Sequence, residues 1–282
     1  MIAVVYSGSH YAHWRLADKD RVIATFKTSG INPYFDDEKR IIQLLNKNIN
    51  LIHHAEEIKR IYFFAAGASS PERIATVHNA LSAFFKFGKV TVGHDIAAAA
   101  IACCKNSPGI ICICGSGTNA AWYDGKKVTP NNYGLGYILA DEGSGNWLGR
   151  QLLKGFMNET LPENIHQKFV QHYDFDRKTL LEKVYRQKQP ALFLSSFTGF
   201  FIDNKEDNYI RGIIKSGFEK MINTYLLPLH DEHPGAFSYF AGSVAAGFQT
   251  LLHEAAADAK LKIANIIKEP INNLLTYYSS KN

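Results

Sequence analysis

The sequence has few cysteines, no long apolar run and no concentrated charge of one sign, and each absence argues against a class of protein. No stretch reaches about 18 uninterrupted apolar residues, so no membrane-spanning helix is predicted. The formal net charge is +5, from 31 basic and 26 acidic residues, and the densest basic clusters are pairs such as Lys126-Lys127. A nucleic-acid-binding protein normally concentrates positive charge on one face. We therefore expect neither a membrane nor a nucleic acid as a partner.

The cysteines also argue against a structural metal site. Cys103, Cys104, Cys112 and Cys114 lie close together on apolar segments, without the paired CxxC spacing that zinc sites favour. Reduced thiols in a protein core are the simpler interpretation. The first residues, MIAVVYSGSHYAHW, lack a basic start and a long apolar run, so no signal peptide is predicted. We expect a cytoplasmic protein.

Short apolar or alternating runs, separated by turn residues, predict two clusters of strands. The first cluster comprises Ile2–Tyr6, Trp14–Ala17 and Val22–Thr28. From there to about residue 105, predicted helices alternate with single strands, which is typical of parallel strands in an α/β sheet. The second cluster comprises Gly109–Cys114, Thr118–Tyr123 and, as a third candidate strand, Lys126–Thr129.

A long helical region, from about Leu161 to Leu229, follows the second cluster. The remaining pattern predicts strands at Phe237–Ala241 and Leu261–Ile267, with one helix at Ser243–Ala256 between them. Because strands followed by helices occur twice, we expect two α/β domains with a cleft between them. Asn, Ser, Pro and Gly cluster at Lys105–Pro108, where we place the boundary.

Three turns carry small or hydroxyl residues that suit a nucleotide. The turns in Cys114–Asn119 (CGSGTN) and Tyr6–His10 (YSGSH) can present backbone N–H groups to a phosphate, although ordinary hairpin loops use the same residues. Two such loops facing one cleft would hold the phosphates from two sides. The turn in Ala241–Val244 (AGSV) allows close approach by a flat ring such as adenine, or is merely a tight turn.

Asp95 precedes the predicted helix Ile96–Cys104 and has two interpretations. An aspartate at a helix start commonly caps the first backbone N–H groups. At a strand-to-helix junction that lines a cleft, it could instead act as a general base. The sequence by itself favours the cap, and the two roles are compatible because a carboxylate has two oxygens.

Four glycines and two acids lie in the twelve residues of GLGYILADEGSG, Gly134–Gly145, just before an amphipathic helix. Favourable interaction with the helix dipole, worth about 0.3–1 kcal/mol, accounts for Asp141 and Glu142 but not for the glycines. A glycine-rich acidic loop that lets the backbone approach a polyhydroxylated ligand accounts for both.

These loops, in this order, resemble the sugar kinase/heat-shock/actin superfamily, and more narrowly the BadF/BadG/BcrA/BcrD-type ATPase family and its N-acetylglucosamine kinase members. The most specific stretch is YGLGYILADEGSGNWLGRQLL, Tyr133–Leu153, which is similar to the family signature LGxxxGDEGSGxxLG. Further matching segments are GINPYF (30–35), GHDIAAA (93–99), GSGTN (115–119) and AGSVA (241–245).

The resemblance covers nearly the whole chain and implies its architecture. We expect an α/β protein with two ribonuclease H-like, actin-like ATPase domains on either side of a nucleotide and sugar cleft. The N-terminal domain would comprise residues 1–105, joined by the C-terminal helix 270–282, and the C-terminal domain residues 106–269.

The resemblance also implies a role for each matching residue. Asp95 would contact the sugar and take the proton from the hydroxyl that attacks the γ-phosphoryl of ATP. Further sugar contacts would come from Asn32, Ser69, Gly136 and Asp141. The residues implied in nucleotide or phosphate binding are Ser7, Gly8, Ser9, His10, Gly115, Ser116, Gly117, Thr118, Gly242 and Ser243. The implied cofactors are ATP and Mg²⁺, the metal being held through the phosphates rather than by a direct protein site.

The first phosphate loop departs from the family pattern DxGSTKT. The chain has YSGSHYA at Tyr6–Ala12, so the leading acid, which helps to hold the Mg²⁺ shell, is replaced by Tyr6. His10 stands where the pattern has its first Thr, and it would contact phosphate if protonated. Loss of the acid removes an electrostatic contribution that could amount to several kcal/mol.

Three functions therefore remain open. The favoured one is an ATP-dependent kinase of an amino sugar, N-acetylglucosamine. The alternative is a catalytically impaired sugar-binding or regulatory protein on the kinase fold, which the altered first loop supports. The third is the ATP-driven activator branch of the same family, in which cysteines bind an iron–sulfur cluster. The expected partners are small molecules, and a homodimer is compatible with the sequence.

Overall fold

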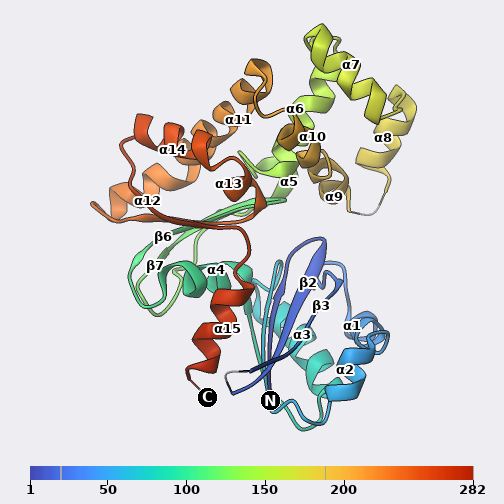
Figure 1. Cartoon of the computed structure of the whole chain (residues 1–282), viewed down its shortest axis with the longest axis vertical. Helices are drawn as coiled ribbons and strands as arrows, with labels where there is room; N and C mark the ends of the chain where they lie inside the picture. Colours follow the sequence, from blue (N-terminus) through green and yellow to red (C-terminus); the bar gives the residue numbers. More distant parts are fainter. Residues whose placement is uncertain (20, 188, 282) are drawn as a thin grey trace. The chain divides into compact units, whose positions relative to one another are not determined.

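The computed structural model describes residues 1–19, 21–187 and 189–281, and contacts between residues divide the chain into two units (Figure 1). Unit 1 comprises Met1–Ser107, Gly125–Val128 and Glu269–Asn282, and unit 2 comprises Pro108–Asp124 and Thr129–Lys268. Asn282, the end of the C-terminal helix expected from the sequence, lies outside the described residues.

Unit 1 contains a five-stranded sheet in the order β3-β2-β1-β4-β5. Its strands are β1 (Ile2–Ser7), β2 (Tyr11–Asp18), β3 (Arg21–Ser29), β4 (Arg60–Ala65) and β5 (Lys89–His94). The pairs β1–β2 and β2–β3 are antiparallel, whereas β1, β4 and β5 run parallel. The sequence pattern predicted this change, because only β4 and β5 are reached through helices.

The helices of unit 1 pack on the sheet around an apolar core that includes a few aromatic side chains. They are α1 (Glu38–Leu45), α2 (Ile49–His54), α3 (Pro71–Phe84), α4 (Asp95–Cys104) and α15 (Ile271–Ser279). Trp14 is fully buried, and its ring centroid lies 5.9 Å from that of Phe63. Helix α4 is buried on nearly all sides and alanine-rich, which allows close packing against its neighbours. Helix α15 packs against α4, although it lies far from it in sequence (Figure 1).

Unit 2 contains a four-stranded sheet in the order β7-β6-β8-β9. Its strands are β6 (Gly109–Cys114), β7 (Thr118–Tyr123), β8 (Ser238–Ala241) and β9 (Ile263–Ile267). β6 and β7 form an antiparallel hairpin, and β6, β8 and β9 run parallel. This sheet repeats the pattern of unit 1 without a counterpart of β3.

Most of unit 2 is helical. Its helices are α5 (Gly136–Leu139), α6 (Gly145–Met157), α7 (Glu163–His172), α8 (Arg177–Tyr185), α9 (Pro190–Ser195), α10 (Thr198–Asp203), α11 (Asn208–Met221), α12 (Leu227–Glu232), α13 (Ser243–Gly247) and α14 (Gln249–Asp258), with a π-helix, η1, at Ile222–Leu226. Their apolar faces enclose one cluster that includes Phe169, Phe197, Phe201 and Phe218. This core fixes α6, which carries several candidate site contacts.

Two sequence predictions for the segments after β7 were wrong in detail. Lys126–Thr129 forms no strand, only an isolated bridge at Val128, and Thr129 N–H donates to the carbonyl of Trp122. The expected single helix at Ser243–Ala256 is two helices, because the backbone of Phe248, with φ −122° and ψ 33°, is not helical. Apolar spacing alone does not reveal such a break.

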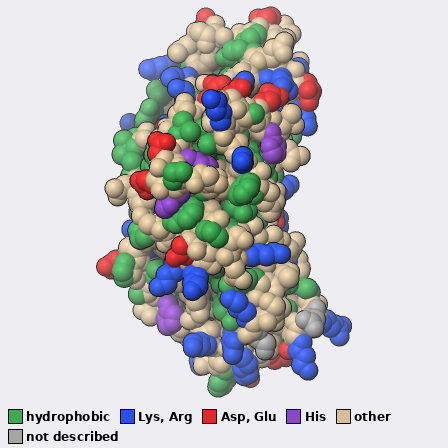
Figure 2. Space-filling model, turned by 90° about the vertical axis from the view of Figure 1, so that its left-hand side faces the viewer, with side chains coloured by type: hydrophobic (Ala, Val, Ile, Leu, Met, Phe, Trp, Pro, Cys, Tyr) green, Lys and Arg blue, Asp and Glu red, His purple; other side chains and the backbone are tan. Residues whose placement is uncertain are grey.

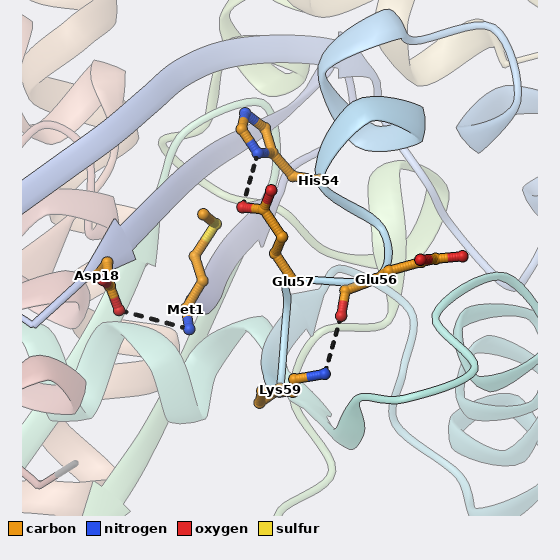
Figure 3. A network of polar contacts seen from close by, with 6 residues as sticks. All are labelled: Met1, Asp18, His54, Glu56, Glu57 and Lys59. Atoms are coloured by element: carbon orange, nitrogen blue, oxygen red, sulfur yellow. Dashed lines mark hydrogen bonds and ion pairs between the residues drawn. The ribbon is translucent and has the colours of Figure 1, made fainter.

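The edge of the unit 1 sheet where β1 begins is held by surface polar contacts (Figure 3). The terminal amino group of Met1 lies 3.5 Å from Asp18, and Lys59 Nζ donates to the carbonyl of Glu56 over 2.9 Å. His54 lies 3.3 Å from Glu57 on the same side. Exposed pairs of this kind contribute at most about 1 kcal/mol each, so this edge is stabilised mainly by the core beneath it.

The surface mixes side chains of different kinds. On the face shown in Figure 2, hydrophobic side chains are interspersed with polar and charged ones. Among the residues that the structure describes, no helix has the length and apolar character needed to cross a membrane.

Candidate functional site

In unit 1, several predicted site residues follow strands that end at the same edge of the sheet. Ser7 at the end of β1 pairs in register with Ala65 at the end of β4. Ala65 in turn pairs with His94 at the end of β5. The loop after β1, the loop after β4 and the start of α4 therefore leave the carboxyl edge of three parallel strands. This edge is where open α/β sheets commonly bind ligands.

Asp95 is the first residue of α4 rather than its N-cap. The N-cap is His94, whose side chain makes no capping hydrogen bond, so the cap expected at Asp95 was misplaced by one residue. The Asp95 carboxylate still lies in the first turn, where the helix dipole favours a negative charge. Its Oδ1 lies 3.2 Å from His94 Nε2, without the geometry of a hydrogen bond, and is buried with no hydrogen-bond partner.

Tyr6, at the position of the missing acid, lies close to Asp95. Burial, followed by the negative charges of Asp95 and Glu269, raises the pKa of Tyr6 far above its usual range. His13 is the cross-strand partner of Tyr6, and its Nδ1 lies 3.3 Å from Glu269 Oε2. The phenol is therefore neutral, and carboxylates lie near it from two other segments of the chain.

The loop after β1 is shaped mainly by its own hydrogen bonds. Ser7 Oγ is buried, accepts from Ile31 N–H over 2.8 Å and donates to Ile31 O over 3.0 Å. Gly8 N–H donates to Tyr11 O over 3.0 Å, which closes the turn. Ser9 and His10 are exposed. Ser7 thus anchors the loop, and Ser9 and His10 are the members with exposed side chains.

Asn32 and the loop that carries Ser69 lie next to each other. A Cβ built on Gly67 would lie 2.2 Å from Asn32 Oδ1, which is too close for any side chain. Gly67 also has a φ of +81°, so its backbone conformation independently requires glycine. Asn32 Oδ1 also accepts from Tyr34 N–H over 3.0 Å. Ser69, two residues after Gly67, is exposed. The fold therefore brings these two predicted sugar contacts into one region of unit 1.

In unit 2, the predicted nucleotide loops also meet at one edge of the sheet. Ile113 near the end of β6 is level with Ala241 at the end of β8. Gly242 follows with a φ of +135°, and a Cβ there would lie 2.3 Å from Cys114 O and 3.0 Å from Gly115 N. Only glycine allows this contact, which joins the loop at Gly115 to the turn at Gly242. Ser243, the next residue, is exposed.

The loop from Gly115 to Gly117 is docked on the start of α6. Gly145 N–H donates to Gly115 O over 2.8 Å, and Asn146 N–H donates to Ser116 O over 3.1 Å. Gly115 N–H donates to Gly117 O within the loop, over 3.0 Å. Backbone N–H groups of the first turn of α6 are thus satisfied by loop carbonyls, which fixes the shape of the loop.

Asp141 is a buried carboxylate whose two oxygens both accept hydrogen bonds. Thr118 N–H donates to Oδ1 over 2.8 Å, and Asn146 Nδ2 donates to Oδ2 over 2.7 Å. Burial raises the pKa of Asp141, although these hydrogen bonds and the charge of Arg150 act in the opposite direction. Thr118 Oγ1 donates to Glu142 O over 2.9 Å, so Thr118 is an anchor between the predicted phosphate loop and the acidic loop.

Glycine is required at positions 117 and 136 for two different reasons. A Cβ on Gly117 would lie 3.0 Å from Asp141 Oδ1, so Gly117 allows the carboxylate to approach the loop. Gly136, the first residue of α5, has a φ of +81° and open space where a Cβ would lie. Its backbone conformation, rather than crowding, requires glycine.

Sequence reasoning missed several buried polar groups of unit 2 that have no hydrogen-bond partner. The side-chain oxygens of Asn119 and Asn146 and the Nε of Arg150 are buried without a hydrogen-bond partner. Asn119 lies against Gly134, where a Cβ would be 3.0 Å from its amide nitrogen. Asn119 stood within the quoted GSGTN motif, but only burial reveals its unpaired oxygen. Unpaired buried acceptors are uncommon and suit a ligand with several hydroxyl groups.

The four thiols are buried, in keeping with the composition. Burial raises the pKa of Cys104 and Cys114 to about 12 and raises those of Cys103 and Cys112 as well. Protonated, enclosed thiols are poor metal ligands. Within the described part of the chain, no group of three or more His, Cys, Asp or Glu side chains is arranged to hold a metal ion.

Comparison with solved structures shows which proteins share this fold. The proposed N-acetylglucosamine kinase from Porphyromonas gingivalis has a TM-score of 0.93 and 29% sequence identity, over 99% of each chain. A second proposed N-acetylglucosamine kinase, from Chromobacterium violaceum, has a TM-score of 0.70 and 13% identity over 98% of this chain and 99% of that one. A ROK family glucokinase from Streptomyces griseus, solved with glucose and AMPPNP, has a TM-score of 0.58 and 13% identity over 99% and 98% of the two chains.

No protein-family model and no curated protein matches the chain. The structural neighbours nevertheless cover it from end to end, and the two at 13% identity show the fold alone. The fold class predicted from the sequence is confirmed. The chain has the α/β fold of the sugar kinases and actin-like ATPases, and its resemblance to N-acetylglucosamine kinase-like proteins, first seen in its motifs, is confirmed.

Proposed function

We propose that this protein is a kinase that transfers the γ-phosphoryl group of ATP to a hydroxyl of an amino sugar, N-acetylglucosamine. The observation that carries the proposal is the position of the Asp95 carboxylate and its unpaired oxygen. Its carboxylate stands at the carboxyl edge of three parallel strands, and its buried Oδ1 has no hydrogen-bond partner. A sugar hydroxyl would supply that partner and would lose its proton to Asp95 as it attacks phosphorus.

The proposed sugar contacts are side chains that accept hydrogen bonds from hydroxyl groups. They are Asp141 and the unpaired side-chain oxygens of Asn119 and Asn146, together with Asn32 and Ser69, the contacts that the resemblance implies. N-acetylglucosamine is the proposed acceptor because the neighbour at 29% identity is itself proposed to act on that sugar. ATP is the proposed donor, with its phosphates at Gly115–Thr118 and at Ser9 and its adenosine at Gly242 and Ser243.

The carboxylates near Tyr6 would fit the hydrated Mg²⁺ that accompanies ATP. Glu269 is partly exposed, with 42% of its side-chain surface accessible, and the Asp95 carboxylate lies near Tyr6 as well. Both are hard oxygen donors of the kind that Mg²⁺ prefers, and here they would act through water. Bound Mg²⁺ would neutralise phosphate charge, whereas positioning and proton transfer would come from the chain itself.

The proposal is tested by isothermal titration of the protein with Mg-ATP and N-acetylglucosamine, followed by a coupled ADP-release assay. Sugar-dependent ADP release that is lost in Asp95→Asn would support it. Asp176→Asn is the matched control, because Asp176 caps α8 through Thr179 N–H, a role that asparagine retains. Equal loss of activity in both variants would contradict the role of Asp95.

A second function is favoured by Tyr6. A neutral, buried phenol replaces the acid of the first phosphate loop, so the chain could bind sugar without turnover. Sugar binding with neither ATP binding nor ADP release in the same experiment would identify a sugar-binding or regulatory protein. It would contradict the proposed kinase activity.

A further inference from the structure

Tyr225 lies in an irregular part of a long helix. Helix α11 continues through η1 into α12, and Leu227 N–H donates to Ile222 O, five residues back instead of four. Pro228, in the first turn of α12, has no N–H to donate to residue 224, and its ring crowds that carbonyl. The chain relieves this conflict by widening one turn, and such π-turns are frequent at functional sites.

The widened turn directs Tyr225 into the protein, where it bridges two adjacent residues of the acidic loop. Tyr225 as a whole is 2% exposed. Its hydroxyl accepts from Asp141 N–H over 3.1 Å and donates to Glu142 Oε2 in a short hydrogen bond. The ring of Tyr133 packs edge-on against it, with centroids 5.2 Å apart.

This bridge supports a residue in a strained conformation. Asp141 has a φ of +67°, in the left-handed region that residues with a Cβ avoid. Its carboxylate accepts hydrogen bonds from Thr118 N–H and Asn146 Nδ2, and its backbone N–H donates to the hydroxyl of Tyr225. Without the hydroxyl, that buried N–H would lose its partner, and Asp141 could relax towards an ordinary φ.

We propose that Tyr225 is a positioning residue for sugar binding: its hydroxyl fixes Asp141 in the left-handed conformation that aims the carboxylate at the sugar. This inference rests on the proposed function and deepens it. The competing interpretation is a core tyrosine that merely satisfies nearby polar groups. The two differ because a core role affects stability alone, whereas a positioning role affects sugar affinity more than turnover or ATP affinity.

The test uses Tyr225→Phe, which removes only the hydroxyl. The matched control is Tyr209→Phe on α11, because Tyr209 makes no side-chain hydrogen bond within the described residues. For each variant we would measure calorimetric sugar affinity, KM for sugar, KM for ATP, kcat and the midpoint of thermal unfolding. We expect Tyr225→Phe to weaken sugar binding about tenfold, equivalent to about 1.4 kcal/mol, with kcat and KM for ATP within about twofold.

Two substitutions of Glu142, the residue that accepts from the Tyr225 hydroxyl, test the same bridge from its other end. Glu142→Gln keeps an oxygen that accepts from Tyr225, so sugar affinity should stay within about threefold of wild type, whereas Glu142→Ala should resemble Tyr225→Phe. A lower unfolding midpoint with unchanged sugar affinity in Tyr225→Phe would overturn the positioning role and leave the kinase standing. Wild-type protein that binds sugar without turnover would overturn the kinase alone, because calorimetry still tests Tyr225. Wild-type protein that binds no sugar would overturn both.

Discussion

Asn146 donates a hydrogen bond from Nδ2 to Asp141 Oδ2 over 2.7 Å, and its backbone N–H donates to Ser116 O over 3.1 Å. One residue in the first turn of α6 thus holds the buried acid and the predicted phosphate loop at once. If sugar and phosphate bind there as proposed, the fold couples the two positions without a contact between the ligands.

Asn146→Ala should destabilise the protein by about 1–3 kcal/mol, because the buried carboxylate of Asp141 loses a donor. Asn158→Ala, an exposed position just after α6, should change the free energy of unfolding by less than about 0.5 kcal/mol. Urea denaturation of both variants measures the difference. Equal effects would show that the 2.7 Å contact contributes little.

Gly117→Ala should lower both stability and sugar affinity, since its Cβ would lie 3.0 Å from Asp141 Oδ1 and displace the carboxylate. A cost of about 1–3 kcal/mol is typical of such overpacking. Gly212→Ala is the control: Gly212 lies within α11 with nothing within 4 Å of an added Cβ. It should stabilise the protein by about 0.5–1 kcal/mol. Thermal unfolding and sugar titration distinguish the two, and a neutral Gly117→Ala would argue against the close approach.

His10→Ala should leave ATP affinity within about twofold at pH 7.5. Although its side chain is exposed, partial desolvation of the ring lowers the pKa of His10, so the imidazole is neutral at that pH and carries no charge for phosphate. Calorimetric titration with Mg-ATP at pH 7.5 is the measurement. A tenfold loss of affinity would instead support the protonated contact considered from the sequence.

The thiols should resist alkylation in the folded protein. With pKa values of about 12 at Cys104 and Cys114, hardly any thiolate forms at pH 8, and burial restricts access as well. Mass spectrometry after iodoacetamide treatment should find these cysteines modified only in urea. Because their pKa is higher in the folded state than in the unfolded state, the unfolded state loses protons first, and stability should fall as the pH rises above about 9. Rapid labelling of native protein at pH 8 would contradict their burial.

The sequence by itself determined the fold class and the order of the chemical segments. Alternation of strands and helices up to Cys104 indicated parallel strands, and GSGTN, ADEGSG and AGSVA marked the candidate binding loops of the second half of the chain. Such signals are local, because strand period and glycine-rich turns depend on neighbouring residues. The resemblance added a role for Asp95 that spacing alone did not favour over a helix cap.

The tertiary structure decided which polar groups in these loops are already hydrogen-bonded to other parts of the protein. Ser7 and Thr118 look like phosphate contacts in the sequence, yet their hydroxyls are bonded to Ile31 and Glu142 within the fold. Tyr225 meets Asp141 across 84 residues through a π-turn that apolar spacing does not reveal. Hydrogen bonds between distant segments depend on packing, and packing brings together residues that no local pattern connects.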